Sequence, residues 1–439
     1  MKKVRRLVGL CFRAMRHPRT YLKAMRHQSH EFLTIWYNWL FIVPRNVRRI
    51  SRKQTVNVVF LAMNPDMWKY GGIYELLRRD ARFNPIIVIA TRMNATQEVR
   101  LREQALTAAF FEKKGYRAIP GFDVKTGSYI DLKTLNPDLI FHTQPYNHVV
   151  ADAFDYRRYR NVLHCYAPYG FSLTNVAWNW DNMLQNICWR QFVVGDYQVH
   201  LAQTVSRIRG KNTVGVGYCI EEELHQANGN RLGKAAAWRN DPRKHVIWAP
   251  HHSIYERELF KVSSFLEIAE EMRQIRKAYA DKVIFAFKPH PMLKAKLLAL
   301  WGEARTEAYY AEWEHSDNSF LSLGAYQLLF AGSDAMIHCS GSFIVEYLYT
   351  NKPVQYVYAK NRNPPDLGVI GDAALEAHYP AHGADDIRRF LDQVVLGGND
   401  SLVEERKALA DKYLRAPAGE LFSNNVYQEL KKGLGWNNG

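Results

Sequence analysis

From Thr55 onward, short runs of apolar, β-branched residues alternate with longer stretches in which apolar residues recur at helical spacing. This alternation is typical of parallel βαβ units, which build an α/β protein with helices on both faces of each sheet. Six such strands make one doubly wound, Rossmann-like domain. In the first half we predict strands at Val56–Met63, Pro85–Ala90, Asp138–His142, Asn161–Cys165, Gln191–Val194 and Thr213–Val216.

The pattern breaks over Gln226–Pro242, a polar stretch with Asn and Gly that predicts an interdomain linker. Beyond it the same alternation resumes and predicts a second Rossmann-like domain. Its strands are expected at His245–Ala249, Lys282–Lys288, Asp334–His338 and Pro353–Tyr358, and its helices at Glu258–Ala280, Leu293–Trp301, Phe320–Phe330, Phe343–Tyr349, Ala384–Val395 and Leu402–Leu414. We therefore divide the chain into residues 1–55, 56–225 and 243–439.

Residues 1–55 form a basic amphipathic arm. They hold fourteen Lys and Arg and one acid, Glu31, and so carry thirteen of the sixteen net positive charges of the chain. Apolar residues recur at helical spacing from Val4 to Met15, and Phe32–Val43 is rich in Trp and other aromatic residues. Short apolar helices bracketed by Arg suit the headgroup layer of an anionic membrane. The alternatives are that Phe32–Val43 packs on the body as a core helix, or that the arm is a transit peptide or binds nucleic acid.

The rest of the chain carries a net charge of only +3, so the body lacks the basic surface expected of a nucleic-acid-binding protein. The five cysteines are scattered without paired spacing, which argues against a disulfide framework and favours a reducing compartment. No secretory signal and no uncharged apolar stretch of 18 residues is visible. We expect a cytoplasmic protein that is peripheral on the inner face of the cell membrane.

Three loops that follow predicted strands of the second half carry the candidate chemistry. They read Ala249-Pro250-His251-His252-Ser253, Lys288-Pro289-His290-Pro291 and His338-Cys339-Ser340-Gly341-Ser342. Ligands of open α/β sheets bind beyond the carboxyl ends of the strands, so all three loops are expected to face one crevice.

Ser340, Gly341 and Ser342 open a predicted helix, where backbone N–H groups, hydroxyls and the helix dipole favour phosphate. Read alone, this serine turn is an ordinary helix cap. Glu346 follows Ser342 by four residues and is expected on the same helix face, where an acid accepts hydrogen bonds from ribose hydroxyls. Lys288 is a candidate counter-charge for phosphate.

His290, between two prolines, and one of His251 and His252 are candidate catalytic residues, since histidine exchanges protons near neutral pH. We expect only one of the two adjacent rings to point inward. A zinc site is an alternative, but the spacing matches no zinc motif, and the chain lacks GxGxxG, GxxxxGK[ST] and GxSxG. We predict no metal and no cofactor.

The block from Ser333 to Tyr347, followed by Lys352-Pro353-Val354, resembles the C-terminal signature of the CDP-glycerol glycerophosphotransferases, which build teichoic acids and related capsule polymers. Ser342, Glu346, Lys352 and Pro353 stand at matching positions. Ile247-Trp248-Ala249-Pro250 resembles the strand of that family that ends in Ala-Pro, and Phe287–Pro291 resembles its His-Pro loop. The resemblance runs from about Gly217 to Tyr358. It implies a GT-B architecture, monotopic membrane attachment and a CDP-alditol donor bound by Pro250, Lys288, Ser340, Gly341, Ser342 and Glu346.

The chain departs from that family at several points. Cys339 stands where the family has Asp, and His251-His252-Ser253 replaces its Thr-Trp-Arg. The Trp-His-Gly-Thr-Pro motif of the N-terminal domain is replaced by the segment from His164 to Gly170, so His164 and Tyr169 are candidates for the acceptor side.

The resulting prediction is a transferase that moves a glycerol-phosphate-like unit from a CDP-activated donor to a membrane-linked or capsule acceptor and releases CMP. One alternative is a GT-B glycosyltransferase that uses a CMP- or UDP-sugar. A second is a catalytically inactive scaffold of surface-polymer assembly, which the missing motif and Cys339 favour.

Overall fold

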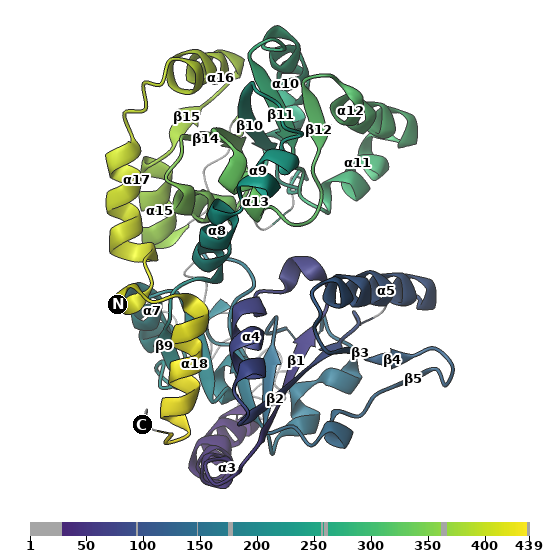
Figure 1. The fold of residues 1–439 in the computed structure, drawn as a ribbon, viewed down its shortest axis with the longest axis vertical. Coiled ribbons are helices and arrows are strands. Elements are labelled where there is room, and N and C mark those ends of the chain that lie inside the picture. Colours follow the sequence, from purple (N-terminus) through teal and green to yellow (C-terminus); the bar gives the residue numbers. More distant parts are fainter. Residues whose placement is uncertain are drawn as a thin grey trace, which may run out of the picture.

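The computed structural model describes residues 29–93, 95–146, 148–173, 179–255, 258, 262–360 and 367–436. The chain forms two lobes, each built on a parallel sheet (Figure 1). The first lobe contains the strands up to β9 and the second contains β10 to β15. This arrangement confirms the prediction of two Rossmann-like halves. The assignment of residues 1–55, 56–225 and 243–439 to separate domains stays a proposal.

The sheet of the first lobe has seven strands in the order β3-β2-β1-β6-β7-β8-β9, all parallel. Six of them correspond to the predicted strands, and β3 was missed because it is only three residues long. A small β4–β5 hairpin stands outside the sheet. The bounds are β1 Val56–Ala62, β2 Phe83–Ile89, β3 Ala118–Pro120, β4 Phe122–Asp123, β5 Ser128–Tyr129, β6 Leu139–His142, β7 Leu163–Tyr166, β8 Arg190–Val193 and β9 Thr213–Gly215.

Helices cover this sheet and bury its apolar strands on both faces. Strand β1 is buried at every position except the half-buried Asn57, as expected of a central parallel strand. Helices α4 (Gly71–Arg79) and α5 (Gln97–Lys113) contact β2, and α7 (Asp196–Val205) contacts β9. Helix α6 (Met183–Ile187) begins with a capping box made by Asn182 and Gln185.

The segment predicted to be an interdomain linker, Gln226–Pro242, lies between β9 and β10 and is mostly helical, and not the irregular stretch that its composition suggested. Helix α8 (Cys219–Gly229) continues through its first residues and α9 (Arg231–Ala237) follows at once. Asn230 caps α9, because its side chain accepts a hydrogen bond from the Gly233 N–H at 2.8 Å. The residues that suggested a chain break are therefore a helix stop and a helix start, and α8 lies between the lobes (Figure 1).

The second sheet has six parallel strands in the order β12-β11-β10-β13-β14-β15. Its four predicted strands are confirmed, and the short β12 and β15 are additional. The predicted helix Phe320–Phe330 is wrong, because its start is strand β12 and Gly324 turns the chain at φ +77° before the helix begins. The strands are β10 Lys244–Ala249, β11 Val283–Phe287, β12 Ser319–Leu321, β13 Ala335–His338, β14 Val354–Val357 and β15 Tyr379–Ala381.

Helices of the second lobe pack on this sheet and on one another. Helix α11 has the predicted bounds, whereas α10 is shorter than predicted. They are α10 Phe265–Ala278, α11 Leu293–Trp301, α12 Glu303–His315, α13 Gln327–Gly332, α14 Phe343–Glu346, α15 Gly368–Glu376, α16 Ala384–Arg389 and α17 Val403–Leu409. Residues Phe390–Leu396 and Ala410–Leu414 continue α16 and α17 as π-helices.

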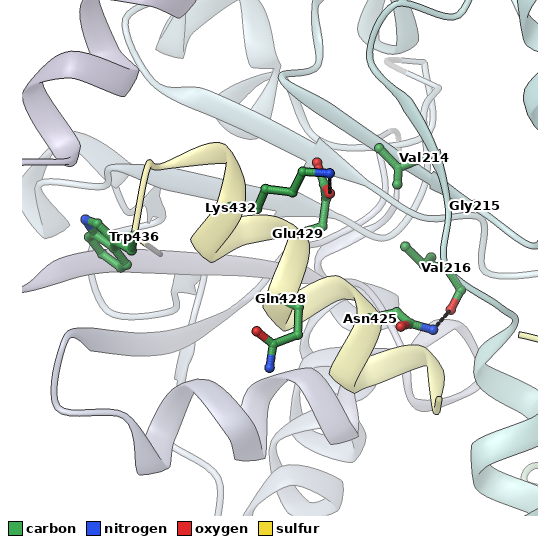
Figure 2. A pocket seen from close by; sticks show the side chains of 8 residues that line it. All are labelled: Val214, Gly215, Val216, Asn425, Gln428, Glu429, Lys432 and Trp436. Atoms are coloured by element: carbon green, nitrogen blue, oxygen red, sulfur yellow. Dashed lines mark hydrogen bonds and ion pairs between the residues drawn. The ribbon is translucent and has the colours of Figure 1, made fainter. Parts of the chain in front are cut away.

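The last helix, α18 (Phe422–Gly433), returns to the first lobe and packs against α4 (Figure 1). Ser423 is tied to α8, because its backbone N–H and hydroxyl both donate to Glu222. A groove of about 390 Å³ lies between α18 and the edge strand β9, spanned by the Asn425 amide, which donates to the Val216 carbonyl at 3.1 Å (Figure 2).

The N-terminal helical region packs on the first lobe with one face and is exposed on the other. Residues 29–37 are helical, followed by a π-helix at Asn38–Ile42 and by α3 (Val43–Ile50). The Asn38 amide donates to the Ile187 carbonyl and the Trp39 indole to the Asn186 carbonyl, each at 2.9 Å. Part of the predicted arm is therefore a docked helix, as the alternative of a packed helix expected. The predicted helix from Val4 to Met15 lies outside the described residues.

The outer face of this helix is a stripe of large apolar side chains. Among the described residues, no helix combines the length and apolar character needed to cross a membrane. The members of this exposed stripe are 51–62% exposed and comprise Phe32, Leu33, Trp36, Tyr37, Leu40 and Phe41.

Candidate functional site

The three loops singled out in the sequence meet at one edge of the second sheet. They follow β10, β11 and β13, which are neighbours in that sheet, and parallel pairing aligns Trp248 with Phe287 and Ala249 with His338. The His290 N–H donates to the Pro250 carbonyl at 3.0 Å and so ties the first two loops together. The predicted common crevice is therefore where the carboxyl ends of these strands meet.

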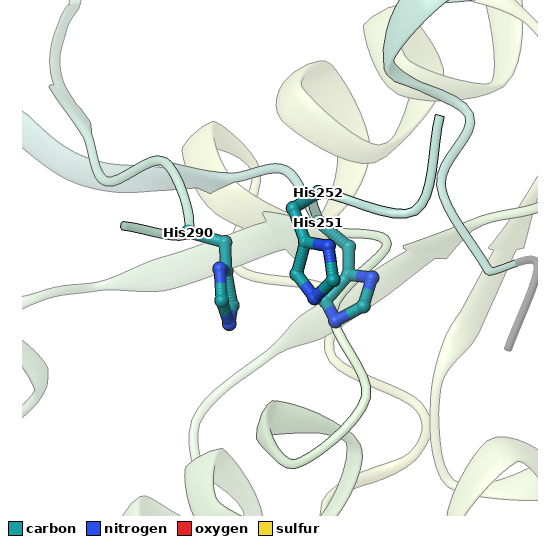
Figure 3. Close-up of side chains that lie close together, drawn as sticks. All are labelled: His251, His252 and His290. Carbon is teal, nitrogen blue, oxygen red and sulfur yellow. The ribbon is translucent and has the colours of Figure 1, made fainter. Parts of the chain in front are cut away.

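His251, His252 and His290 form a cluster of three rings at this edge (Figure 3). The ring centroids of His251 and His252 are 4.3 Å apart, those of His252 and His290 4.2 Å, and those of His251 and His290 5.1 Å. The expectation that only one of His251 and His252 points inward is wrong. Both rings join His290 because the chain leaves the extended conformation after β10, so neighbouring side chains no longer alternate.

Burial keeps these rings uncharged near neutral pH. Desolvation, reinforced by Lys296, lowers the pKa of His252 to about 4. Desolvation, with the neighbouring His252 and Lys288, lowers the pKa of His290 to about 3. The pKa of His251 is also held well below its ordinary value, first by burial and then by the other two rings.

The histidine cluster borders a pocket of about 430 Å³ between the lobes, called here the interlobe pocket, which His290 does not itself line. His251 and His252 line it from the second lobe together with Gly341 and Ser342 of the serine turn. The first lobe contributes the segment after β7. The remaining lining residues are Phe171, Ser172, Leu173 and Asn179 of the first lobe and Ser253, Glu258, Val262 and Leu367 of the second.

The serine turn lies beside the histidines, as predicted. Ser342 precedes α14 and makes no side-chain capping hydrogen bond, so the plain-cap alternative lacks its characteristic contact. Ser340 is buried, and its N–H donates to the Nδ1 atom of His338 at 3.1 Å. Cys339 is fully buried, with its Sγ atom accepting from the His251 N–H at 3.5 Å. This sulfur therefore accepts a backbone hydrogen bond from the first histidine loop and connects that loop to the loop after β13.

Glu346 and Lys288 lie in the contact between the lobes, apart from the residues that line the interlobe pocket. Glu346 is 2% exposed, and its carboxylate accepts hydrogen bonds from the Tyr218 hydroxyl at 2.8 Å and the Tyr326 hydroxyl at 2.6 Å. Lys288 donates to the Gly324 carbonyl at 2.8 Å, and burial lowers its pKa to about 8. Their proposed contacts with ribose and phosphate stay predictions.

The two candidates for the acceptor side lie in different surroundings. His164 is buried in β7, where its Nδ1 atom contacts Nε2 of His142 at 2.9 Å and its Nε2 atom contacts the Tyr159 carbonyl at 3.1 Å. Tyr169 is 40% exposed in the loop after β7. The structure does not bring His164 to the interlobe pocket, and its acceptor role stays a prediction.

Sequence reasoning missed Lys296 and Glu258, which support the histidine cluster. Lys296, in the first turns of α11, contacts the Glu258 carboxylate, and its Nζ atom lies 2.9 Å from Nδ1 of His252. The available signal was the position of Lys296 in the helix that begins directly after the His290 loop. The contact of Lys296 with Glu258 was not predicted, because Glu258 was assigned to the helix Glu258–Ala280, whereas α10 begins only at Phe265.

The sequence matches no protein-family model and no curated protein. Solved structures share the fold. A histidine variant of the wall teichoic acid polymerase TagF is 11% identical with a TM-score of 0.60, over 93% of this chain and 98% of that chain. S. aureus MnaA with UDP is 12% identical with a TM-score of 0.54, over 87% and 98% of the two chains. UDP-GlcNAc 2-epimerase from Neisseria meningitidis, bound to UDP-GlcNAc, is 12% identical with a TM-score of 0.53, over 86% and 100%. These likenesses establish the two-lobed GT-B fold, as predicted.

Proposed function

We propose that this protein is a transferase that uses a nucleotide-activated donor, and that the donor is a CDP-linked, glycerol-like alditol. An acceptor hydroxyl attacks the β-phosphorus, a new oxygen–phosphorus bond forms, the bond to the bridging oxygen breaks, and CMP leaves with that oxygen. Positioning and electrostatic stabilisation supply most of the catalysis of such phosphoryl transfers.

The observation that carries this proposal is the convergence of His251, His252 and the serine turn on the interlobe pocket, with the His290 ring packed against both of the other rings. A pocket of about 430 Å³ is within the range that small-molecule ligands occupy. Buried polar N–H groups beside backbone and hydroxyl donors suit a diphosphate, and the fold shared with TagF supports a donor of the teichoic acid type.

We further propose that the acceptor is lipid-linked or a growing polymer and that the protein works on the inner face of the cell membrane. The exposed stripe supports this proposal, because six large apolar side chains on one helix face exceed what a helix docked on the body requires. The stripe runs directly into α3, where Arg45 and Arg48 are also exposed. Apolar side chains next to basic ones suit the boundary between acyl chains and anionic headgroups.

A second candidate is a GT-B glycosyltransferase that takes a sugar from a CMP- or UDP-sugar. It is favoured by the neighbours of the same fold whose titles name UDP and UDP-GlcNAc. The two candidates share a nucleotide-activated donor in the same pocket and differ in the group transferred, and a UDP-sugar also differs in the base.

A panel of cytidine and uridine diphospho-compounds tests the donor. CDP-glycerol is expected to raise the melting temperature of the full-length protein more than UDP-GlcNAc does, since a ligand at 100 times its Kd adds about 2.7 kcal/mol of stability. Release of CMP with a lipid acceptor tests turnover. Stabilisation by uridine compounds alone would favour the glycosyltransferase, and cytidine binding without turnover would favour a scaffold.

Flotation with vesicles that contain anionic phosphatidylglycerol tests the membrane surface. Trp36→Ser and Phe41→Ser are each expected to weaken binding about tenfold, because keeping half of an aromatic side chain from water is worth about 1–2 kcal/mol. Leu232→Ser is the matched control, since Leu232 is 84% exposed on α9. Equal flotation of all three variants would contradict the assignment of the stripe to the membrane.

A further inference from the structure

The histidine cluster has the geometry of two different sites. One ring nitrogen of each of His251, His252 and His290 lies within 4.8 Å of those of the other two, which is close enough to share a metal ion or a single anion. Figure 3 shows the three rings with one nitrogen of each turned to the same side. Which ligand fits depends on whether those nitrogens carry a lone pair or a proton.

The His251 ring is held by Ser253 so that its Nδ1 atom is an acceptor. The Ser253 N–H donates to this Nδ1 at 3.2 Å, and the Ser253 hydroxyl lies 2.8 Å from it. The hydroxyl oxygen already accepts the N–H groups of Val262 and Ser263, so its own proton points to the ring. A neutral His251 therefore carries its ring proton on Nε2.

His290 and His252 are held in the same way by different donors. The Met292 N–H donates to Nδ1 of His290 at 3.1 Å. Lys296 donates from Nζ to Nδ1 of His252 at 2.9 Å, and the adjacent Glu258 carboxylate holds the ammonium in place. An ammonium group has protons to donate and no lone pair, so His252 also carries its ring proton on Nε2.

All three neutral rings thus use their Nδ1 lone pairs inside the protein and keep their Nε2–H groups as donors, those of His251 and His252 at the wall of the interlobe pocket. A metal needs the opposite arrangement, in which the bound nitrogen offers its lone pair and the other ring nitrogen donates to an acceptor. A general base also needs a free lone pair on the side of the substrate. Three N–H donors that converge on one point instead match the oxygens of a phosphoryl group.

We propose that His251, His252 and His290 form a three-donor oxyanion site that binds a phosphoryl group through their Nε2–H groups. The site acts by hydrogen bonding and takes up no proton. That this phosphoryl group belongs to the nucleotide-activated donor rests on the proposed function. The binding of an anion by the three rings does not depend on it.

Inorganic pyrophosphate tests the site with the full-length protein. With histidine labelled by ¹⁵N, two-bond correlation spectra distinguish the two neutral tautomers and a metal-bound ring. The expected result is an Nε2–H pattern for all three rings, with shifts that saturate when pyrophosphate is added and no metal-bound pattern when Zn²⁺ is added. Absence of any pyrophosphate shift, or an Nδ1–H pattern with Zn²⁺ bound at one equivalent, would overturn the proposal.

Matched amide variants provide the second measurement. The amide nitrogen of glutamine reaches the position of Nε2, whereas that of asparagine reaches only Nδ1. His290→Gln is therefore expected to bind pyrophosphate within about threefold of the unsubstituted protein, and His290→Asn about 10- to 100-fold more weakly, as for a lost hydrogen bond to a charged group. His315→Asn, on the exposed end of α12, is the control.

Equal losses in the Gln and Asn variants, with melting temperatures unchanged, would refute the donor role. The proposed function is tested separately. If the protein binds pyrophosphate as described but releases no CMP from CDP-glycerol, the oxyanion site stands and only the proposed donor is contradicted.

Discussion

The docked N-terminal helix makes a strong prediction about truncation. Removing residues 2–28 deletes none of the described residues, whereas removing residues 2–55 also deletes the helical region that covers the first lobe. The charge and length of residues 1–55 alone predict an arm that neither sheet needs. The structure predicts instead that the second truncation, which removes this helical region, does not leave the fold intact.

The magnitude follows from the buried face of that helix. Ile35, Ile42, Val43 and Ile50 are at most 8% exposed. Burying each such side chain is worth about 1.5–3 kcal/mol, so the four together contribute about 6–12 kcal/mol. Typical domains are stable by only about 5–15 kcal/mol, so the loss is comparable with the whole stability of the lobe.

The deletion also removes two cations from a buried acid. The Asp138 carboxylate, 1% exposed, accepts from Arg49 at 2.7 Å and from Lys53 at 2.6 Å. Without these partners it retains the Asn57 N–H at 3.0 Å. A buried charge that loses its partners destabilises the fold further, so the two costs act in the same direction.

Urea unfolding followed by circular dichroism measures the effect. The protein without residues 2–28 is the reference, and the protein without residues 2–55 is expected to lose the cooperative transition of that reference. Ile50→Ala, expected to cost about 2–5 kcal/mol, and Phe32→Ala, expected to cost less than about 0.5 kcal/mol, separate the two faces of the helix. An unchanged midpoint without residues 2–55 would refute the reasoning.

Two further predictions concern buried polar groups. Burial lowers the pKa of His164 to about 4 and of His378 to about 3, so as pH falls below the ordinary value of 6.5 the unfolded chain binds protons first. Each histidine should then lower the free energy of unfolding by about 1.4 kcal/mol for every pH unit until the pH reaches its folded pKa. A constant urea midpoint between pH 7 and pH 5 would contradict this. Glu346→Gln should lower stability by about 1.5–3 kcal/mol, because each carboxylate oxygen accepts from one tyrosine hydroxyl and the amide nitrogen of Gln cannot accept. Urea midpoints alongside Tyr218→Phe measure this, and a Gln variant as stable as the parent would show that the contact adds nothing.

The sequence predicted the strands that position the site because those strands are long and apolar. Ten of the sheet strands were found within a few residues, and the carboxyl-end rule then brought His251 and His290 to one edge without any knowledge of tertiary contacts. Helix α11 was predicted with its observed bounds, since a Pro-rich loop precedes it and Gly302 ends it.

The errors have local physical causes. Strands of three residues, such as Ser319–Leu321, are too short to show a period, and a single glycine turn after one of them was enough to misassign the segment as a helix. Asn230 was interpreted as a chain break although it caps a helix. Contacts of side chains across long sequence distances, such as Glu346 with Tyr218, leave no periodic signal and were missed altogether.

The return of α18 to the first lobe also affects the order in which the chain can fold during synthesis. The sheet of the first lobe is complete at β9, yet Tyr427 and Trp436, which pack against Phe83 near its edge, are made about 200 residues later. At about 5–20 residues per second this interval lasts roughly 10–40 seconds. A nascent first lobe therefore emerges from the ribosome with the apolar surface around Phe83 uncovered, and the cover provided by Tyr427 and Trp436 arrives only when translation is almost finished.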